Sequence, residues 1–448
     1  KPLRIFGDLY VQVFRNIPGI ALLIIVVYAL PPLKVVLPYR TCVIVATVLL
    51  GSAFGSENFM SGINTVGVGQ VEAARSLGMS FNRILAKIVI PQALRSSVLP
   101  MTNLFIAVML TTALGSQVPL KPQELTGVVS YINTRSLGGV AAFFISALGY
   151  LGTAFVVSHI GNYIDKKVGS SDEQAFLPAL TMRDALYEAP GPKMRAKIRI
   201  GTAISLVAVA ALAILVLQRF YVTGQLSVHY WYFFTHLTTW KFLLAGFEGT
   251  VKVALTAGAI ALVLGLALML GRTSEIKPLQ LVCRVLTDFF RGVPSLLFIY
   301  FFFLVLPQYK IALPSFWMLT LPVALAAAGV LAEIFRAGVN AVPRGQVEAA
   351  QALGLSKAKI TFKIVLPQAI RFIIPSLISQ LVVVVKDTTV AYVVSYPDLM
   401  QNARVLITNY DALVSVYLVI AVIYILINVA INKAAVYVSH KTGATIIR

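Results

Sequence analysis

The chain has 448 residues, of which 58% are hydrophobic and only 12% charged, and its mean hydropathy is +0.85. This composition excludes an ordinary soluble domain, in which about a quarter of the residues are charged. The formal net charge of +20 would suit a nucleic-acid-binding protein, so the positions of the charges must decide whether that class applies.

Ten apolar segments are candidates to cross a bilayer as helices, which takes about 20 residues each. In chain order, the first four are residues 18–37, 41–59, 96–114 and 138–164. The other six are residues 200–217, 247–270, 292–306, 316–335, 372–394 and 412–435. The sequence therefore predicts an all-α integral membrane protein with about ten transmembrane helices and the lipid bilayer as its surroundings.

The charges are distributed unevenly between the two sides of these spans. If the spans alternate and Lys1 lies inside, 26 of the 37 Lys and Arg residues fall in inside segments and seven outside. The remaining four, Lys34, Lys252, Lys386 and Lys433, lie within the span ranges. Because cytoplasmic loops of membrane proteins carry an excess of Lys and Arg, the net charge indicates a basic cytoplasmic face and no nucleic-acid partner.

The chain aligns with itself at an offset of 276 residues. Residues 69–78 and 345–354 agree at eight of ten positions, and residues 87–95 and 363–371 agree at seven of nine. These blocks flank a polar loop whose length is also kept, which chance similarity between apolar helices would not produce. The chain therefore contains two homologous halves.

The halves differ at their beginnings, since two spans precede Lys277 in the second half whereas the equivalent residue of the first half is Lys1. We expect a first half at residues 1–165 that is truncated at its N-terminus and a second half at residues 198–448. Residues 166–197, which contain the turn-prone Pro190-Gly191-Pro192, are expected to form a cytoplasmic linker or junction. A natural fusion and two polypeptides joined in one numbering both fit this pattern.

Each copy of the repeated loop can form a short helix. Glu72, Ala73 and Ala74 are good helix formers, and the small side chains of this stretch allow a helix to pack closely in a groove. Gly78 then supplies the helix stop, and Pro91 suits the first turn of the helix that follows. The second copy repeats these features with Glu348, Ala349, Ala350, Gly354 and Pro367.

The pattern Gly-Gln-x-Glu-Ala-Ala-x-x-Leu-Gly, followed by Pro-Gln-Ala-(Leu or Ile)-Arg, resembles the EAA loop of binding-protein-dependent (type I) ABC importer permeases of the polar amino-acid subfamily. Both halves carry it, and the resemblance covers nearly all of the chain outside the linker. The run from Glu188 to Lys193 further resembles glutamate-type permease pairs of actinobacteria. The resemblance implies the type I importer transmembrane fold in two permease halves, in a bacterial cytoplasmic membrane.

In that family the loop docks on an ATPase subunit, so the resemblance implies two ATPase partners, one for each half. It also implies import of a polar amino acid of the glutamate, glutamine or aspartate type, delivered by a soluble extracytoplasmic solute-binding protein. The residues expected to couple the chain to the ATPases are Gly69, Glu72, Ala73, Ala74, Gly78, Gly345, Glu348, Ala349, Ala350 and Gly354.

The sequence shows no sign of catalysis by the chain itself. It contains no Gly-x-x-x-x-Gly-Lys-(Ser or Thr) phosphate loop, and its four His residues are scattered without metal-ligand spacing. We therefore expect no catalytic residue, no metal site and no cofactor in this chain, with ATP and Mg bound by the partner subunits.

Polar residues within the spans are candidates for the solute pathway, because an ionisable residue at a helix centre costs roughly 2.5–3.5 kcal/mol on insertion scales. Lys386 and Asp387 could together meet the two charges of a zwitterionic solute. Alternatively, Lys386 snorkels outward and Asp387 caps or pairs locally. The first half lacks the charged pair, so the site would be asymmetric. The predicted pathway residues are Lys386, Asp387, Thr388, Thr389, Thr111 and Thr112.

Glu57 and Glu333 occupy equivalent places near the cytoplasmic ends of two spans. Arg336 follows Glu333 by one helical turn, and the two can pair within their own helix. We interpret these three residues as gate or structural residues.

A secondary transporter or channel is the alternative function, because repeated halves around a midplane site also describe such proteins. A secondary carrier needs no docking helices repeated on one face, and it needs a coupling-ion site that the sequence does not identify. The repeated loop therefore favours the ATP-driven importer.

Overall fold

The structure is a computed structural model that describes residues 2–135, 138–168 and 192–441. Within these ranges the regular elements are helices, and eight of them are long and apolar enough to span a membrane. Two further pairs of helices pass the same test together, which gives up to ten spans as predicted. Most of the predicted linker (residues 169–191), including the start of the Glu188–Lys193 run, lies outside the described residues.

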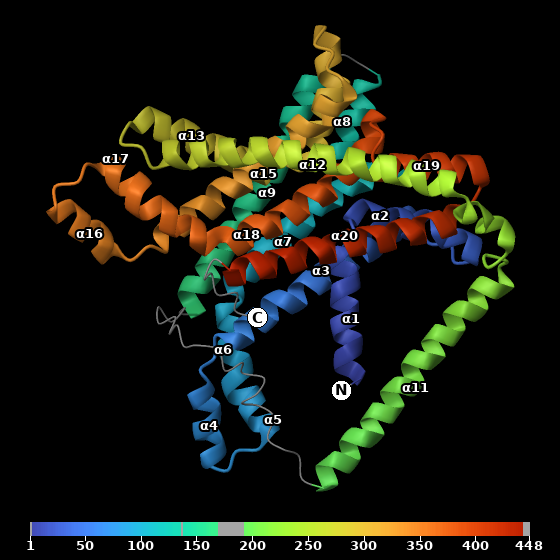
Figure 1. Cartoon of the computed structure of the whole chain (residues 1–448), viewed down its shortest axis with the longest axis horizontal. Helices are drawn as coiled ribbons and strands as arrows, with labels where there is room; N and C mark the ends of the chain where they lie inside the picture. Colours follow the sequence, from blue (N-terminus) through green and yellow to red (C-terminus); the bar gives the residue numbers. More distant parts are fainter. Residues whose placement is uncertain (1, 136–137, 169–191, 442–448) are drawn as a thin grey trace.

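The first half consists of long helices joined by shorter helical elements (Figure 1). Its spans are α3 (Tyr39–Asn64), α7 (Val98–Thr111) with η4 (Thr112–Gln117), and α9 (Gly139–Val168), and a bent pair is formed by α1 (Pro2–Asn16) and α2 (Gly19–Ile24) with η1 (Ile25–Ala29). The shorter elements are η2 (Pro31–Leu33), α4 (Val68–Ser76), α5 (Phe81–Ile84), η3 (Leu85–Val89), α6 (Ile90–Ser96) and α8 (Leu125–Asn133).

The second half repeats this order after two leading helices. Those leading helices are α11 (Pro192–Val222) and α12 (Leu237–Arg272), which are separated by η5 (Val228–Tyr230) and η6 (Tyr232–Thr235). The remaining elements are α13 (Lys277–Gly292), α14 (Ser295–Tyr300), η7 (Phe301–Val305), η8 (Leu306–Tyr309), α15 (Ser315–Asn340), α16 (Arg344–Ala352), α17 (Lys357–Ile360), η9 (Thr361–Val365), α18 (Leu366–Asp387), η10 (Thr388–Val394), α19 (Leu399–Tyr410) and α20 (Leu413–Lys441).

The bent pairs occur at equivalent places in the two halves. The chain turns by 104° between α1 and α2 and by 98° between α13 and α14. Pro18 and Pro294 stand at these bends, each in an extended conformation just before the second helix. Since α1 and α13 are amphipathic and end at a sharp turn into an apolar helix, they suit the membrane surface rather than its interior.

Local backbone conformations repeat at the same offset of 276 residues. The π-helical turns η1 and η3 recur as η7 and η9. Lys34 and Lys310, at equivalent positions, both adopt the left-handed conformation, with φ of 56° and 62°. The sequence duplication is therefore a structural duplication.

Pro367 lies in the first turn of α18, as the sequence predicts. The continuous helical span that contains it begins earlier, since it runs from Lys357 to Val394. The π-helical turn η9 comes directly before α18, in which Pro367 lies in the first turn. A local change of helix type absorbs a proline that has no N–H to donate.

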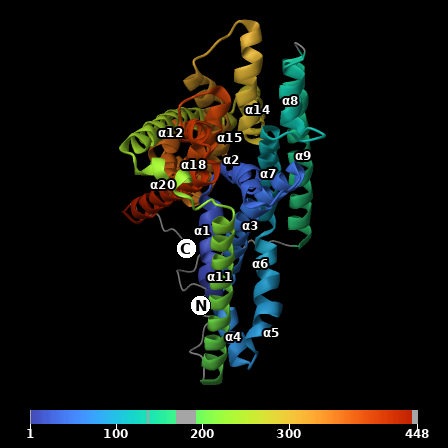
Figure 2. The ribbon, with the colours of Figure 1, turned by 90° about the vertical axis from the view of Figure 1, so that its right-hand side faces the viewer.

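The two halves form one body, with α9 and α20 each packing across the boundary (Figure 2). α9 of the first half contacts α13 and η7, and α20 of the second half contacts the equivalent α1 and η1. One buried apolar cluster contains residues of both halves, among them Leu23 of α2 and Ile420 of α20. α11 is different, because it contacts α1 of the first half, although the sequence places it with the second. The Arg219 side chain fixes this position by donating from Nε to the Leu33 carbonyl at 2.6 Å.

Candidate functional site

The repeated loops form matching helical hairpins, α4 with α5 and α16 with α17, which extend from the body of the molecule (Figure 1). α4 and α16 have the same length, nine residues. Gly78 and Gly354 end these hairpin helices with φ of 75° and 72°, a left-handed conformation that glycine adopts without steric strain. The predicted helix stops are thus found at the predicted residues.

Each Glu-Ala-Ala stretch presents one face outward and one inward. Glu72 and Ala73 are exposed, whereas Ala74 is 3% exposed and packs with Val71 and Ile84 inside the hairpin. The second loop repeats this division with Glu348, Ala349 and Ala350. Only the acid and the first alanine of each motif are therefore free to meet another protein.

Two exposed leucines on these loops were not singled out from the sequence. Leu77 is 82% exposed and the equivalent Leu353 is 80% exposed. A Cβ added at Gly69 or at Gly345 would meet no described atom within 4 Å. Each loop therefore exposes a leucine and, in the first turn of its helix, a glycine with open space beside it. The leucines could have been found from the sequence, because they occupy the same place in both copies of the repeated ten-residue block.

Equivalent glutamine pairs close both hairpins. The Gln92 Nε2 donates to the Gln70 Oε1 at 2.6 Å, and the Gln368 Nε2 donates to the Gln346 Oε1 at the same distance. Each pair ties the loop helix to the helix that leads into the next span. The coupling helix and the span are thus connected by side chains as well as by the backbone.

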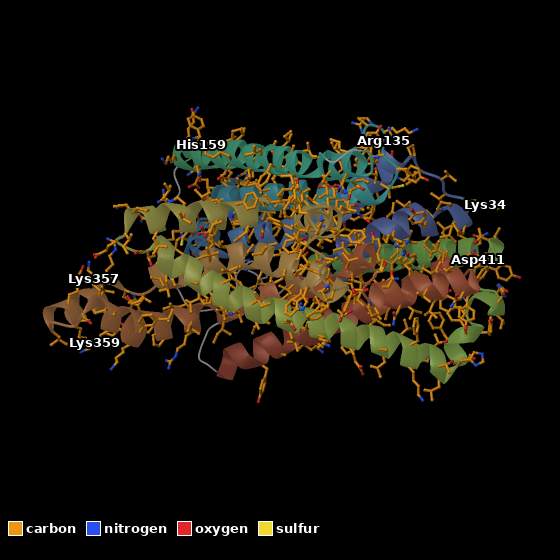
Figure 3. All side chains as sticks on the ribbon, turned by 90° about the horizontal axis from the view of Figure 1, so that it is seen from above. Lys34, Arg135, His159, Lys357, Lys359 and Asp411 are labelled. Atoms are coloured by element: carbon orange, nitrogen blue, oxygen red, sulfur yellow. The ribbon has the colours of Figure 1, made fainter. Side chains whose placement is uncertain are left out.

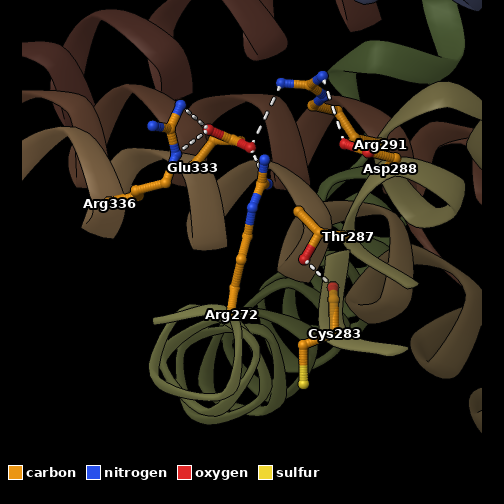
Figure 4. A network of polar contacts seen from close by, with 7 residues as sticks. All are labelled: Arg272, Cys283, Thr287, Asp288, Arg291, Glu333 and Arg336. Carbon is orange, nitrogen blue, oxygen red and sulfur yellow. Dashed lines mark hydrogen bonds and ion pairs between the residues drawn. The ribbon is translucent and has the colours of Figure 1, made fainter. Parts of the chain in front are cut away.

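Glu57 and Glu333 pair with equivalent arginines of α1 and α13. The Arg15 Nη1 lies 3.1 Å from the Glu57 Oε2, and the Arg291 Nη1 lies 3.9 Å from the Glu333 Oε1. Glu333 also holds Arg336 at 2.7 Å, as the sequence predicts, and it binds Arg272 at the end of α12 (Figure 4). One carboxylate, 16% exposed, thus connects three helices at the cytoplasmic side.

Lys386 lies between the halves, where it caps a helix. Its Nζ donates to the Arg15 carbonyl, and the Asn428 Nδ2 donates to the Asn16 carbonyl at 2.6 Å. The unsatisfied carbonyls at the C-terminus of α1 therefore receive two donors from the second half, one of them cationic. This contact is different from both the outward snorkelling and the free pathway charge that the sequence suggests. Asp387 hydrogen bonds to Ser295, at the start of α14.

The four predicted pathway threonines bond within their own helices. The Thr111 and Thr112 hydroxyls donate to carbonyls three or four residues earlier, at 2.8 and 2.6 Å. Thr388 and Thr389 are almost fully buried and do the same at 2.8 and 2.5 Å. These threonines lie where the α-helices α7 and α18 end and the 3₁₀ segments η4 and η10 begin. The two 3₁₀ segments therefore occupy equivalent positions in the two halves.

A polar network connects the halves at these two segments. Gln117, the last residue of η4, accepts from the Tyr392 hydroxyl of η10 at 2.6 Å and donates to the Tyr300 hydroxyl at 2.6 Å. The Arg404 guanidinium lies 4.6 Å from the centre of the Tyr392 ring. No pattern in the sequence pointed to this network, because the residue equivalent to Gln117 is Val393.

A buried acid caps the helix that follows each 3₁₀ segment. Glu124 accepts from the backbone N–H groups of Thr126 and Gly127 at 2.8 and 2.5 Å, and Asp398 accepts from the Gln401 N–H at 2.7 Å. Burial raises the pKa of Glu124 and raises the pKa of Asp398 to about 7. In Figure 1, α8 lies far from α4 and α19 lies far from α16, so each cap is distant from the coupling loop of its own half.

A tyrosine follows each of these acids by 26 residues. Tyr150 donates to the Glu124 Oε2 at 2.9 Å. Tyr424 is the counterpart for Asp398, but its hydroxyl and the Asp398 Oδ2 are both buried and have no hydrogen-bond partner among the described residues. The hydrogen bond between acid and tyrosine is therefore formed in the first half and not formed between the equivalent described residues of the second.

Lys357 and Lys359 of the second coupling loop lie at one end of the molecule, whereas Lys34 and Asp411 lie at the other (Figure 3). Two duplicated helical halves, joined along a polar contact and carrying one hairpin each, define a multi-pass membrane permease.

Comparison with known proteins identifies the family. The profile of the binding-protein-dependent transport system inner membrane component family matches residues 1–170 and 261–443, so it matches both halves. The glutamate transport system permease protein GluD of Corynebacterium glutamicum is 36% identical over 229 residues, which are 49% of this chain and 82% of that protein. The probable glutamine ABC transporter permease protein GlnP of Bacillus subtilis is 32% identical, over 43% of this chain and 90% of its own length. A solved amino acid ABC transporter with histidines is 28% identical, covers 47% of this chain and 98% of its own, and has a TM-score of 0.45.

The chain belongs to the family of binding-protein-dependent transport system inner membrane components. It is a multi-pass protein of the bacterial cytoplasmic membrane and an importer permease of the ABC type, as the sequence predicts.

Proposed function

We propose that the chain forms the translocation pathway of an importer for a polar amino acid of the glutamate, glutamine or aspartate type. The names of its relatives support this class, since they include permeases for glutamate, glutamine and arginine. The chain supplies the pathway, and ATP and Mg are bound and ATP is hydrolysed by partner subunits. A soluble extracytoplasmic solute-binding protein brings the amino acid to the side opposite the coupling loops.

The observation that carries this proposal is the pair of equivalent hairpins. Each presents an exposed glutamate, an exposed alanine and a leucine that is 80% exposed or more. An apolar side chain exposed to this degree at a helix end, beside a charge, suits a groove of a partner protein. Two such hairpins, one from each half, suit two ATPase subunits.

The glutamine pairs offer a physical route for coupling. Gln70 and Gln346 lie on the docking helices, and their partners Gln92 and Gln368 lie at the start of the helices that lead to the spans. A displacement of α4 or α16 by an ATPase would therefore move the following span. The spans that respond in this way, α7 and α18, end at η4 and η10, where Gln117 joins the halves.

The proposal is tested by co-purification of the ATPase with charge-reversed variants. We expect Glu72→Lys and Glu348→Lys each to weaken ATPase association while insertion into the membrane is kept. Val228→Asp is the control, because Val228 is 77% exposed but lies outside both hairpins. Normal co-purification of both Lys variants would contradict the coupling assignment.

Transport itself is tested with the reconstituted protein, its partner ATPase and its receptor. Uptake of labelled amino acid is expected only with ATP and the complete set of partners. Uptake that persists without ATP or without the ATPase would instead support the secondary transporter.

A further inference from the structure

The contact between the halves contains one exposed cation with no carboxylate partner in the described ranges. Arg404 of α19 is exposed, and its guanidinium lies over the Tyr392 ring at 4.6 Å. Within residues 2–135, 138–168 and 192–441, no ion pair joins Arg404 to an acidic side chain. An arginine that stacks on an aromatic ring keeps its N–H groups directed to the side, where they can bind a carboxylate in a bidentate manner.

The neighbours of Arg404 supply further donors and acceptors. The Tyr392 hydroxyl bonds to Gln117, and Gln117 bonds to Tyr300, so the three side chains form a continuous polar surface that belongs to both halves. Tyr300 is 7% exposed, whereas Tyr392 and Gln117 are partly exposed. Arg404 is thus the charged end of a polar surface at the boundary through which the solute of a two-half permease passes.

The other candidate cation in this part of the molecule is already engaged. Lys386 donates to the Arg15 carbonyl at the C-terminus of α1, where it completes the end of a helix. Moving Lys386 to a solute would leave that carbonyl without its donor, and the desolvation penalty of the bare carbonyl would offset much of the free energy of a new ion pair. The predicted role of Lys386 in binding a charged solute is therefore better filled by Arg404.

The two halves are asymmetric at this position. The acid caps Glu124 and Asp398 and their tyrosines align residue 130 of the first half with residue 404 of the second. Residue 130 is a serine, so only the second half carries a cation at this position of the repeat. A single cation beside a shared surface binds one anionic group and orients the solute relative to the two halves.

We propose that Arg404, with Tyr392 and Gln117, binds a carboxylate of the transported solute at the boundary between the halves. This inference rests on the proposed function and extends it from a polar amino acid to a named contact. The carboxylate is either the α-carboxylate, which every amino acid carries, or the side-chain carboxylate of an acidic one.

The test uses the permease–ATPase complex in nanodiscs for binding of labelled glutamate, and proteoliposomes with receptor for uptake. We expect Arg404→Gln to weaken glutamate binding and to slow uptake by about tenfold or more, as for the loss of one charge-assisted contact. Arg404→Lys should retain part of the activity, because it keeps the charge and loses only the bidentate geometry. Arg135→Gln is the matched control, since the Arg135 guanidinium also stacks on a tyrosine, at 4.1 Å from the Tyr131 ring centre, but that tyrosine is not one of the two that bond to Gln117.

Competition by glutamine and by the α-amide of glutamate separates the two sources of the carboxylate. If Arg404 binds the side-chain carboxylate, glutamine competes weakly and its affinity is unchanged by Arg404→Gln, whereas the α-amide competes as glutamate does. If Arg404 binds the α-carboxylate, the α-amide competes weakly with an affinity that Arg404→Gln does not change, and glutamine competes as glutamate does. Either pattern supports the site.

Two results would overturn the inference. One is a glutamate affinity and uptake rate in Arg404→Gln equal to those of the wild type. The other is loss of receptor co-purification in Arg404→Gln with unchanged binding of free glutamate, which would make Arg404 a receptor-docking residue. In both cases the proposed function stands, whereas a wild-type complex that neither binds nor takes up any amino acid would remove the proposed function as well.

Discussion

The Tyr392 hydroxyl donates a hydrogen bond of 2.6 Å to the side-chain amide of Gln117, although 275 residues separate the two in the chain. The same amide donates to Tyr300, so one side chain of the first half satisfies two tyrosines of the second. The contact therefore joins the halves at the level of the predicted solute pathway.

The first prediction concerns this contact. Gln117→Leu removes the acceptor of the Tyr392 hydroxyl and one of the two partners of the Tyr300 hydroxyl, which keeps Ser116, so we expect the free energy of unfolding to fall by about 1–3 kcal/mol. Thermal unfolding in detergent measures the effect. Gln123→Leu, at an exposed glutamine six residues further on, is the control and should change stability by less than about 0.5 kcal/mol. Equal effects of the two substitutions would show that the network adds no stability.

The second prediction compares two equivalent acids. Glu333 faces three arginines and is 16% exposed, whereas Glu57 faces Arg15 alone and is 48% exposed. Removing the first charge leaves Arg272, which is 19% exposed, and Arg336 unpaired, whereas Arg291 keeps Asp288, so Glu333→Gln should destabilise the protein by about 2–4 kcal/mol. Glu57→Gln removes an exposed pair and should cost less than about 1 kcal/mol. A larger effect at Glu57 than at Glu333 in thermal unfolding would contradict the structural role assigned to the network in Figure 4.

The third prediction separates a helix cap from a solute contact at Lys386. Lys386→Met removes the donor to the Arg15 carbonyl, and we expect a loss of about 1–3 kcal/mol in stability with an unchanged KM for uptake. Lys252→Met is the matched control, because both lysines lie in spans near an aromatic ring, Lys386 at 5.6 Å from the centre of Phe54 and Lys252 at 5.5 Å from the centre of Phe316, but Lys252 is exposed. A raised KM with unchanged stability would instead restore Lys386 to the solute pathway.

The fourth prediction concerns pH. Burial raises the pKa of Asp398 to about 7 in the folded protein, whereas an unfolded aspartate has a pKa of about 3.9. Between these values the folded state binds more protons than the unfolded state, so stability is greatest below about pH 4 and falls as the pH rises towards 7. The tyrosines that face this carboxyl, Tyr396 and Tyr424, ordinarily titrate near pH 10 and do not contribute in this window.

Asp398→Asn tests this pH dependence. The amide oxygen can still accept from the Gln401 N–H and cap α19, but it has no proton to lose. We expect the wild type to lose on the order of 2–4 kcal/mol of stability through this group between pH 4 and pH 7, and the variant to lack that decrease in thermal unfolding across the same range. Asp411→Asn, at an exposed loop position, should keep the wild-type slope. An unchanged slope in Asp398→Asn would assign the pH dependence to other groups.

Much of the architecture follows from local patterns in the sequence. The spans are visible because a helix in lipid must be apolar over about 20 residues. The coupling helices and their stops at Gly78 and Gly354 are visible because a helix and a positive φ are properties of a few consecutive residues, and here the duplication shows each of them twice. The pairing of Glu333 with Arg336 is of the same kind, since it spans one helical turn.

The sequence alone thus determined that the chain is a duplicated helical membrane protein with two equivalent hairpins. Only the tertiary structure decided that Lys386 caps α1, that α11 packs on the first half, and that Gln117 meets Tyr392. Those contacts join residues that lie hundreds of positions apart, and they depend on how complete helices pack against one another. Because the two halves no longer carry the same residues at these contacts, the duplication itself could not reveal them.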